Sequence, residues 1–315
     1  VDMAAALEST RVLSIQSHVV HGYVGNKCAV FALQTHGIEA DPINTVQFSN
    51  NTGYPSWKGQ VLQADQLWSL YEGLVGNELT SYSHLLTGYV NNQGTLETII
   101  KIVKALKAQN PKLKYFCDPV MGDGGVLYKS VPPEMVGLYR TLVFPLADTI
   151  KLNQTELEHL TDMKIASADD AWKAMEALHA YGAEHVVVSS VGYLGDDLIG
   201  VLASTKTDEG KFLRYSMQVA KKNEYYTGTG DLFSALLLAW MEKQGNKDLG
   251  KAMQKVVSSI QYVIANSNDA ANERLKLKEI RLIKSASSVL EPQVLIPYTD
   301  HQAQWAHFFS SKMGY

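Results

Sequence analysis

The sequence contains few cysteines and no long apolar run, and these absences exclude several classes of protein. Its two cysteines, Cys28 and Cys117, lie far apart and form no CxxC motif, so no disulfide framework or redox pair is expected. No apolar stretch approaches the roughly 18–20 residues of a membrane span, and Ala4 to Thr10 show no signal-peptide pattern. A net charge of −4 leaves no basic excess for nucleic acid. We therefore expect a cytoplasmic protein with no nucleic-acid or membrane partner.

The length of 315 residues allows one large domain or two smaller ones. No Pro-, Gly- or Ser-rich linker divides the chain and no internal repeat is present, so we predict one domain over residues 11–315. Val1 and Asp2 precede Met3 and resemble an expression remnant. Residues 1–10 are expected to be disordered.

Short apolar segments alternate with amphipathic ones along most of the chain. Strands are expected at 11–15, 83–90, 114–117, 148–151 and 185–190, helices at 64–75, 95–108, 168–181 and 248–265, and a hairpin at 198–204 and 212–219. Such alternation predicts an α/β fold with a mostly parallel sheet and helices on both faces. Ligands of these sheets gather at the carboxyl ends of the strands.

The most informative stretch is Gly228-Thr229-Gly230-Asp231, which directly precedes a run of apolar residues at helical spacing. The first turn of a helix leaves backbone N–H groups unpaired and carries partial positive charge, and glycines let that backbone approach a phosphate closely. Asp231 could be no more than an acid favoured by the helix dipole. Two glycines around Thr229 are a costly choice for a simple cap, which favours an anion-binding turn.

Two acids follow the expected strand at 114–117, in the sequence CDPVMGDG. Asp118 and Asp123 would repel each other on one loop unless a cation lay nearby, so a site for Mg²⁺ or another divalent ion is predicted. The alternative is two unrelated turns, one Asp-Pro and one Gly-Asp.

The turn at 228–231 resembles the signature of the ribokinase-like small-molecule kinases, and VQFSNNTGY (46–54), TGY (87–89) and DPVMGD (118–123) narrow the resemblance to the pyridoxal kinase family. This resemblance implies a three-layer α/β/α fold with a small β flap over the substrate, and a homodimer. It also implies ATP-dependent phosphorylation of the 5′-hydroxymethyl group of pyridoxal, and of pyridoxine and pyridoxamine, to give pyridoxal 5′-phosphate from pyridoxal. The aspartate of the turn would act as general base.

The resemblance also assigns residues. The catalytic group would be Asp231, Gly228, Thr229 and Gly230, and the vitamin would contact Ser17, Val24, Phe48, Thr52, Tyr89 and Asp231. ATP would contact Asp118, Asn153, Glu156, Ser189, Ser190, Tyr226, Thr227, Gly228, Thr229 and Gly230, and the metal would be held by Asp118, Asp123 and Glu156. Without the resemblance, Ser17 would be a turn serine, Thr52 a bare hairpin tip and Tyr89 a residue of the core rim. Asn153 and Glu156 would form only a helix capping box.

Lys151 departs from the family pattern, because relatives have a threonine there, near a monovalent cation that supports activity. The ammonium of Lys151 could occupy the position of a bound K⁺, since a point charge on a flexible stem can replace that ion electrostatically. The alternative is a lysine that turns outward, with K⁺ still required.

Three rival functions follow from the same residues. A hydroxymethylpyrimidine or sugar kinase of the same superfamily would share the turn at 228–231 but not the flap sequence. A non-catalytic vitamin B6 carrier would have no use for Asp231 or for the pair Asp118 and Asp123. A dinucleotide-dependent dehydrogenase would need a GxGxxG fingerprint, which the first strand and its loop lack.

Overall fold

The computed structural model describes residues 10–222, 224–246, 248–267 and 277–302. The segment predicted to be disordered therefore lies outside the described residues except for Thr10, which is buried and donates a hydrogen bond to Glu242. The last thirteen residues also lie outside them.

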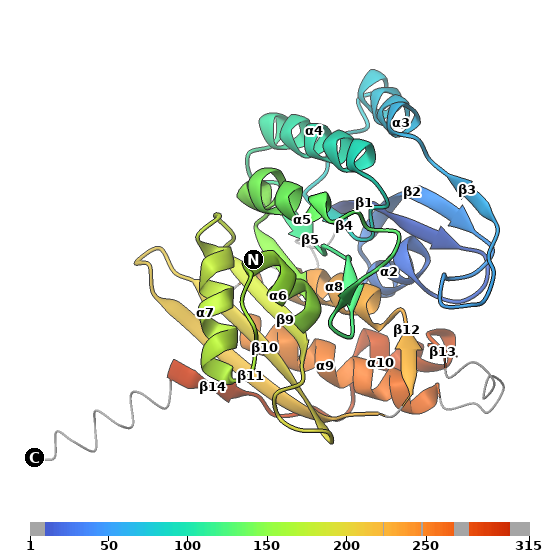
Figure 1. Cartoon of the computed structure of the whole chain (residues 1–315). Helices are drawn as coiled ribbons and strands as arrows, with labels where there is room; N and C mark the ends of the chain where they lie inside the picture. Colours follow the sequence, from blue (N-terminus) through green and yellow to red (C-terminus); the bar gives the residue numbers. More distant parts are fainter. Residues whose placement is uncertain (1–9, 223, 247, 268–276, 303–315) are drawn as a thin grey trace, which may run out of the picture.

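A ten-stranded sheet runs through the described part of the chain in the order β14-β11-β10-β9-β8-β5-β4-β1-β2-β3 (Figure 1). Its strands are β1 (Arg11–Val19), β2 (Glu39–Phe48), β3 (Gly59–Val61), β4 (His84–Thr87), β5 (Lys114–Cys117), β8 (Thr149–Leu152), β9 (His185–Val191), β10 (Leu198–Lys206), β11 (Phe212–Ala220) and β14 (Thr299–Asp300). The central strands from β9 to β2 are parallel, whereas the outer strands join antiparallel. The predicted hairpin of β10 and β11 is confirmed.

Helices cover both faces of this sheet (Figure 1). One face packs on α3 (Ala64–Gly76), α4 (Gln93–Gln109), α5 (Glu134–Leu138), α6 (Gln154–Thr161) and α7 (Ala168–His179). The other packs on α2 (Gly25–Thr35), α8 (Thr229–Lys243), α9 (Leu249–Asn266) and α10 (Ala286–Leu290). The central strands carry apolar residues on both faces because both faces are buried, as in β9, where Val186 and Val188 enter one core and Val187 the other. The predicted α/β fold with a mostly parallel sheet and helices on both faces is confirmed.

Two small sheets lie outside the main one. The first joins β6 (Gly122–Asp123) to β7 (Val126–Leu127), and the second joins β12 (Tyr225–Thr227) to β13 (Leu277–Glu279). Both flank segments that the resemblance places at the active site. None of the helices in the described part of the chain has the length and apolar character needed to cross a lipid bilayer.

Candidate active site

The register of the parallel strands brings Asp118 and Lys151 together at the carboxyl edge of the sheet. Cys117 at the end of β5 lies opposite Ile150 of β8, so the next residues on the two strands are neighbours. Nζ of Lys151 lies 2.9 Å from Oδ2 of Asp118. Lys151 is 6% exposed and Asp118 is 2% exposed. The interpretation of Lys151 as an outward-turned lysine is therefore wrong.

Helix α8 begins directly above this ion pair. Gly228 is the residue before the helix and has a left-handed backbone with φ of 92°, and a Cβ there would lie 2.0 Å from the carbonyl oxygen of Tyr23. A side chain at position 228 is thus excluded by both backbone angle and space. At Gly230 a Cβ would lie 3.2 Å from Nζ of Lys151. Ser234, one turn on, donates a 2.7 Å hydrogen bond to Oδ2 of Asp118.

Asp231 lies in the first turn of α8, where the starts of two helices converge. Its carboxylate interacts with the backbone N–H of Gly25, the first residue of α2. The pKa of Asp231 is raised to about 6, chiefly by burial and also by Asp118, against the opposing effects of the Gly25 N–H and Lys151. A carboxylate that loses its proton near neutral pH is suited to accept a proton from an alcohol.

The pKa of Asp231 predicts the acid limb of the pH profile. A general base works only when deprotonated, so kcat/KM is expected to hold above pH 6 and to fall as the pH drops through about 6. This profile is measured from steady-state rates of ADP release between pH 5 and pH 9, in a coupled assay whose coupling enzymes are kept in excess. A fall of kcat/KM centred near the ordinary aspartate pKa of about 4 would contradict this environment for Asp231.

Glu156 and Asn153 form the capping box that their spacing predicts at the start of α6. Oε2 of Glu156 accepts the backbone N–H of Asn153 at 2.8 Å, and Oε1 accepts that of Met121 at 3.1 Å. The Asn153 amide in turn donates to the carbonyl of Gly122 at 2.8 Å. These bonds fix the loop that carries Asp118 onto the start of α6. Burial and the nearby Asp118 raise the pKa of Glu156 to about 8.

Asp123 lies at the more open end of the same loop. Its carboxylate accepts the N–H of Gly124 at 2.8 Å and interacts with the hydroxyl of Tyr225, which also contacts the hydroxyl of Tyr128. These contacts link the β6/β7 turn to β12, just before the glycine turn. The resemblance assigned no part to either tyrosine.

The acids offer a divalent cation a limited set of ligands. Among the residues that the structure describes, no group of three or more His, Cys, Asp and Glu side chains is arranged to hold a metal. Oδ1 of Asp118, however, is buried and has no hydrogen-bond partner within the described chain. Mg²⁺ in kinases needs only one or two carboxylates, with water and phosphate oxygens completing the shell. The donor set therefore fits a Mg²⁺ ion that arrives with a nucleotide.

The residues predicted to contact the vitamin come from three neighbouring segments. Ser17 lies near the end of β1, against Gly25, where a Cβ would lie 2.1 Å from the Ser17 carbonyl oxygen. Val24 precedes α2 directly. Tyr89 follows β4 and is partly buried against the core, and it interacts with Ser130.

Phe48 and Thr52 belong to the flap, which we define as residues 46–61. Phe48 ends β2, pairs with Val19 of β1 and lies opposite Gly59 of β3. Thr52 lies exposed in the loop that joins the two strands. The flap thus continues the sheet edge beyond β1.

Four further residues predicted to contact the nucleotide lie in β9 and β12. Ser189 in β9 donates to the carbonyl of Leu152 at 3.2 Å, and Ser190 follows it. Tyr226 is buried in β12, and its carbonyl accepts a 3.3 Å hydrogen bond from the Thr229 hydroxyl. Thr227 completes β12 and leads into the turn.

Sequence reasoning also missed a contact of Asp231 and a second contact of Asp118. The N–H of Gly25 reaches Asp231, and the hydroxyl of Ser234 reaches Asp118. A glycine before an apolar run marks Gly25 as a helix start. Ser234 could have been found from its place one turn after Gly230 on a helix that is otherwise apolar at that face.

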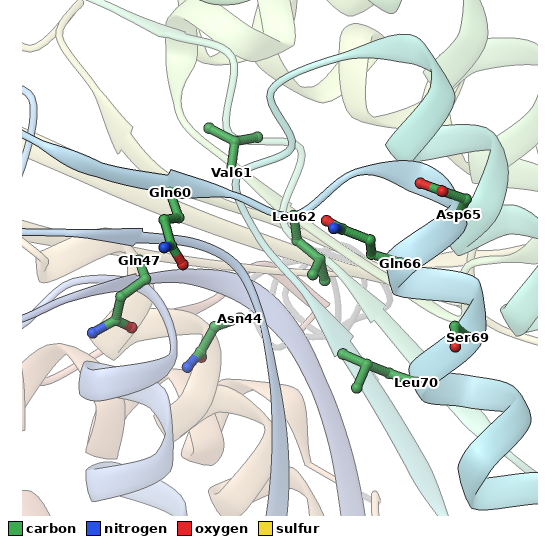
Figure 2. Close-up of a pocket in the computed structure, with 9 residues that line it drawn as sticks. All are labelled: Asn44, Gln47, Gln60, Val61, Leu62, Asp65, Gln66, Ser69 and Leu70. Atoms are coloured by element: carbon green, nitrogen blue, oxygen red, sulfur yellow. The ribbon is translucent and has the colours of Figure 1, made fainter.

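A separate cavity of about 590 Å³ lies between β2, β3 and α3 (Figure 2). Its lining is Asn44, Gln47, Gln60, Val61, Leu62, Asp65, Gln66, Ser69 and Leu70. None of these is among the residues predicted to bind ATP, metal or vitamin. The cavity is therefore distinct from the Asp231 site.

Comparisons with known proteins identify the family of this chain. A family model described as phosphomethylpyrimidine kinase matches residues 81–277. The chain is 46% identical over 296 residues to a pyridoxal kinase of Dictyostelium discoideum, with 90% of this chain and 97% of that protein covered. It is 44% identical over 298 residues to a pyridoxal kinase of Arabidopsis thaliana, with 93% and 95% covered.

A solved structure leads to the same family. Pyridoxal kinase from Leishmania donovani in complex with ADP and pyridoxamine has a TM-score of 0.84 and 34% sequence identity, over 92% of this chain and 99% of that one. The resemblance drawn from the flap, the Asp118 loop and the glycine turn is confirmed, and so is the ribokinase-like fold that it implied. The chain belongs to the pyridoxal kinase family.

Proposed function

We propose that the chain transfers the γ-phosphoryl group of ATP to the 5′-hydroxymethyl group of pyridoxal, with pyridoxine and pyridoxamine as further substrates. The observation that carries this proposal is the position of Asp231. Its carboxylate lies at two converging helix starts, beside the Lys151–Asp118 pair, with a pKa near neutrality. The relatives named pyridoxal kinase and the Leishmania complex with ADP and pyridoxamine support the choice of substrates.

In the proposed reaction Asp231 accepts the proton of the 5′-hydroxyl while that oxygen attacks the γ-phosphorus in line, and ADP leaves from the opposite side. The backbone N–H groups of residues 228–230, at the start of α8, would face the charge that develops on the phosphoryl oxygens. Ser17, Val24 and Tyr89 would position the ring, and closure of the flap with Phe48 and Thr52 would exclude water. Most of the acceleration in phosphoryl transfer comes from such placement and charge stabilisation.

The divalent ion is assigned to the loop at 118–123. Asp118 would hold it through its unpartnered Oδ1, and Asp123 and Glu156 would act from the same loop and the start of α6. Bound there, Mg²⁺ would neutralise charge on the phosphates of ATP. Asn153, Ser189, Ser190, Tyr226 and Thr227 remain the proposed nucleotide contacts.

The ammonium of Lys151 is proposed to supply the positive charge that a bound K⁺ would supply. Burial alone lowers the pKa of Lys151, but Asp118 and Glu156 outweigh burial and raise it, so the ammonium is charged at neutral pH. It lies between Asp118 and the start of α8, where a fixed positive charge offsets nearby carboxylates.

This proposal predicts a kinase that needs no monovalent cation. Exchanging all K⁺ and Na⁺ for a bulky organic cation at constant ionic strength is expected to leave the rate with pyridoxal, ATP and Mg²⁺ unchanged, since the lysine is covalently part of the site. A strong dependence on added K⁺ in the wild-type chain would rule out replacement of the ion by Lys151.

A substrate panel tests the proposed function against its nearest rival. The match to the phosphomethylpyrimidine kinase model favours hydroxymethylpyrimidine as the second candidate substrate. ADP release is measured with pyridoxal, pyridoxine, pyridoxamine, hydroxymethylpyrimidine, ribose or no acceptor. We expect release with the three vitamers above all others. A preference for the pyrimidine would reassign the substrate, and vitamer binding without ADP release would indicate a carrier.

Two further expectations remain proposals. A homodimer is proposed because the resemblance implies one, and a cytoplasmic location is proposed because the two cysteines lie far apart without a CxxC motif, which fits a reducing compartment. Equilibrium sedimentation tests the first, and fractionation of the source cells tests the second.

A further inference from the structure

Glu279 is a carboxylate that neither the sequence motifs nor the proposed reaction uses. It ends β13 and lies opposite Thr227 of β12, directly before the glycine turn. It also approaches Gly22 so closely that a Cβ on that glycine would lie 2.3 Å from Oε2 of Glu279. Gly22 has φ of 86°, which already favours glycine. The segment that carries Glu279 thus meets both the loop after β1 and the strand before α8.

The flap is the third element that reaches Glu279. Nδ2 of Asn51 donates a 2.8 Å hydrogen bond to Oε1 of Glu279, and the hydroxyl of Tyr54 also interacts with the carboxylate. Oδ1 of the same asparagine accepts the N–H of Gly53 at 2.9 Å, so Asn51 shapes the flap turn as well as anchoring it. Asn51 is buried, although its neighbour Thr52 is exposed. Figure 1 shows the loop between β2 and β3 on the same side of the molecule as β13.

A short path leads from Glu279 to the proposed base. The carboxylate interacts with the backbone N–H of Tyr23, and the carbonyl of Tyr23 lies against Gly228. Two residues further along, the N–H of Gly25 faces the carboxylate of Asp231. When Glu279 holds the backbone at Tyr23, it therefore helps to fix both Gly228 and the Gly25 N–H that faces Asp231.

We propose that Glu279 is a positioning residue that connects the flap to the loop at 22–25 and to the glycine turn, so that the vitamin pocket and Asp231 adopt their working geometry together. The reading of this pocket as a vitamin pocket rests on the proposed function. The connection between the flap and the loop at 22–25 rests only on the contacts of Glu279 with Asn51, Tyr54 and the Tyr23 N–H.

A carboxylate suits this position because its neighbours are donors. Asn51, Tyr54 and the Tyr23 N–H all present hydrogens to Glu279, and His21 is the charged or titratable group of the adjoining loop that faces it. A glutamine would keep one acceptor but direct an NH₂ group at these donors. Hydrogen bonds to a charged group are worth more than those to a neutral one.

The kinetic test compares Glu279→Gln with Asn51→Ala and with the double variant. Glu279→Gln is expected to raise KM for pyridoxal by about tenfold or more, as loss of a bond to a charged group implies. KM for ATP is expected to stay close to wild type. KM for pyridoxal in the double variant should be no higher than in Glu279→Gln alone, because both changes break the same hydrogen bond between Asn51 and Glu279. Glu224→Gln, which alters the ion pair of Glu224 with Lys278 beside the same small sheet, is the matched control and should behave as wild type.

Several outcomes would overturn the proposal. The first is a wild-type KM for pyridoxal in Glu279→Gln. The second is an equal rise in KM for pyridoxal and KM for ATP. The third is a rise in KM for pyridoxal in the double variant that equals the product of the rises in the two single variants. Thermal unfolding of each variant shows whether the fold survives, and Glu279→Asp is the second variant if Glu279→Gln does not fold. Glu279→Ala is then the reference variant. A KM for pyridoxal that is lower in Glu279→Asp than in Glu279→Ala supports the proposal, and equal values in the two variants contradict it.

Trypsin cleavage after Lys58 separates this proposal from the proposed function. Lys58 is exposed and directly precedes β3 in the flap, so the rate of cleavage there reports how firmly the flap backbone is held, without any turnover. Faster cleavage in Glu279→Gln than in Glu224→Gln supports the proposal, and equal rates overturn it. If wild type fails to phosphorylate any vitamer, the proposed function fails while this readout still decides the role of Glu279.

Discussion

Replacing Asp231 with asparagine is expected to lower kcat by at least about 10²-fold, the lower end of what a positioned general base contributes. Asparagine keeps the size of the side chain and an oxygen for the Gly25 N–H, so the helix start should remain intact. It cannot accept the proton of the 5′-hydroxyl. The loss should therefore fall on kcat, while KM for ATP and pyridoxal changes little.

The chain offers a matched control for this substitution. Asp248 caps the start of α9 by accepting the N–H of Lys251 at 2.9 Å, and lies outside the candidate site. Asp248→Asn should keep full activity with at most a small loss of stability. Unaltered turnover in Asp231→Asn, with ADP release and product measured in parallel, would remove Asp231 from the role of base.

Replacing Lys151 with methionine is expected to lower the free energy of unfolding by about 3–5 kcal/mol, because it leaves the buried carboxylate of Asp118 unpaired. Asp118 is 2% exposed, so water cannot take the place of the lost ammonium. Chemical denaturation of the two proteins at neutral pH measures the difference. Asp118→Asn combined with Lys151→Met should recover much of the loss, since the carboxylate paired with Lys151 is then neutralised together with the ammonium.

A more exposed ion pair provides the comparison. Lys107 and Asp148 lie 2.7 Å apart with side chains 25% and 22% exposed, and Lys107→Met should cost less than about 1 kcal/mol. An equal loss in the free energy of unfolding for Lys151→Met and Lys107→Met would contradict the view that the pair of Lys151 and Asp118 is buried. In activity, Lys151→Thr should regain turnover when K⁺ is added, whereas wild type should not respond.

Much of the fold could be predicted because its strands are buried on both faces. Continuous apolar runs such as that of β9 identify central parallel strands without any knowledge of their neighbours. The small sheets could not be found this way. β6 and β7 have two residues each, and Thr227 pairs with Glu279 across a segment that carries no periodic signal. Short pairings between distant segments depend on the assembled fold.

The candidate site shows the same division. The glycine turn can be recognised locally, because Gly228 adopts a left-handed backbone, which favours glycine. The capping box of Asn153 and Glu156 also follows from spacing alone. The contact of Lys151 with Asp118 depends on the register of β5 against β8, so the sequence could suggest a cation role for the lysine but not its partner.

The most direct measurement is the identity of the product formed from pyridoxal, ATP and Mg²⁺, determined by mass spectrometry and phosphorus NMR. The account predicts one phosphoryl group on the 5′-oxygen, in an amount equal to the ADP released, and no product from an analogue that lacks the 5′-hydroxyl. Phosphorylation at another oxygen, or ADP release without a phosphorylated vitamer, would contradict it.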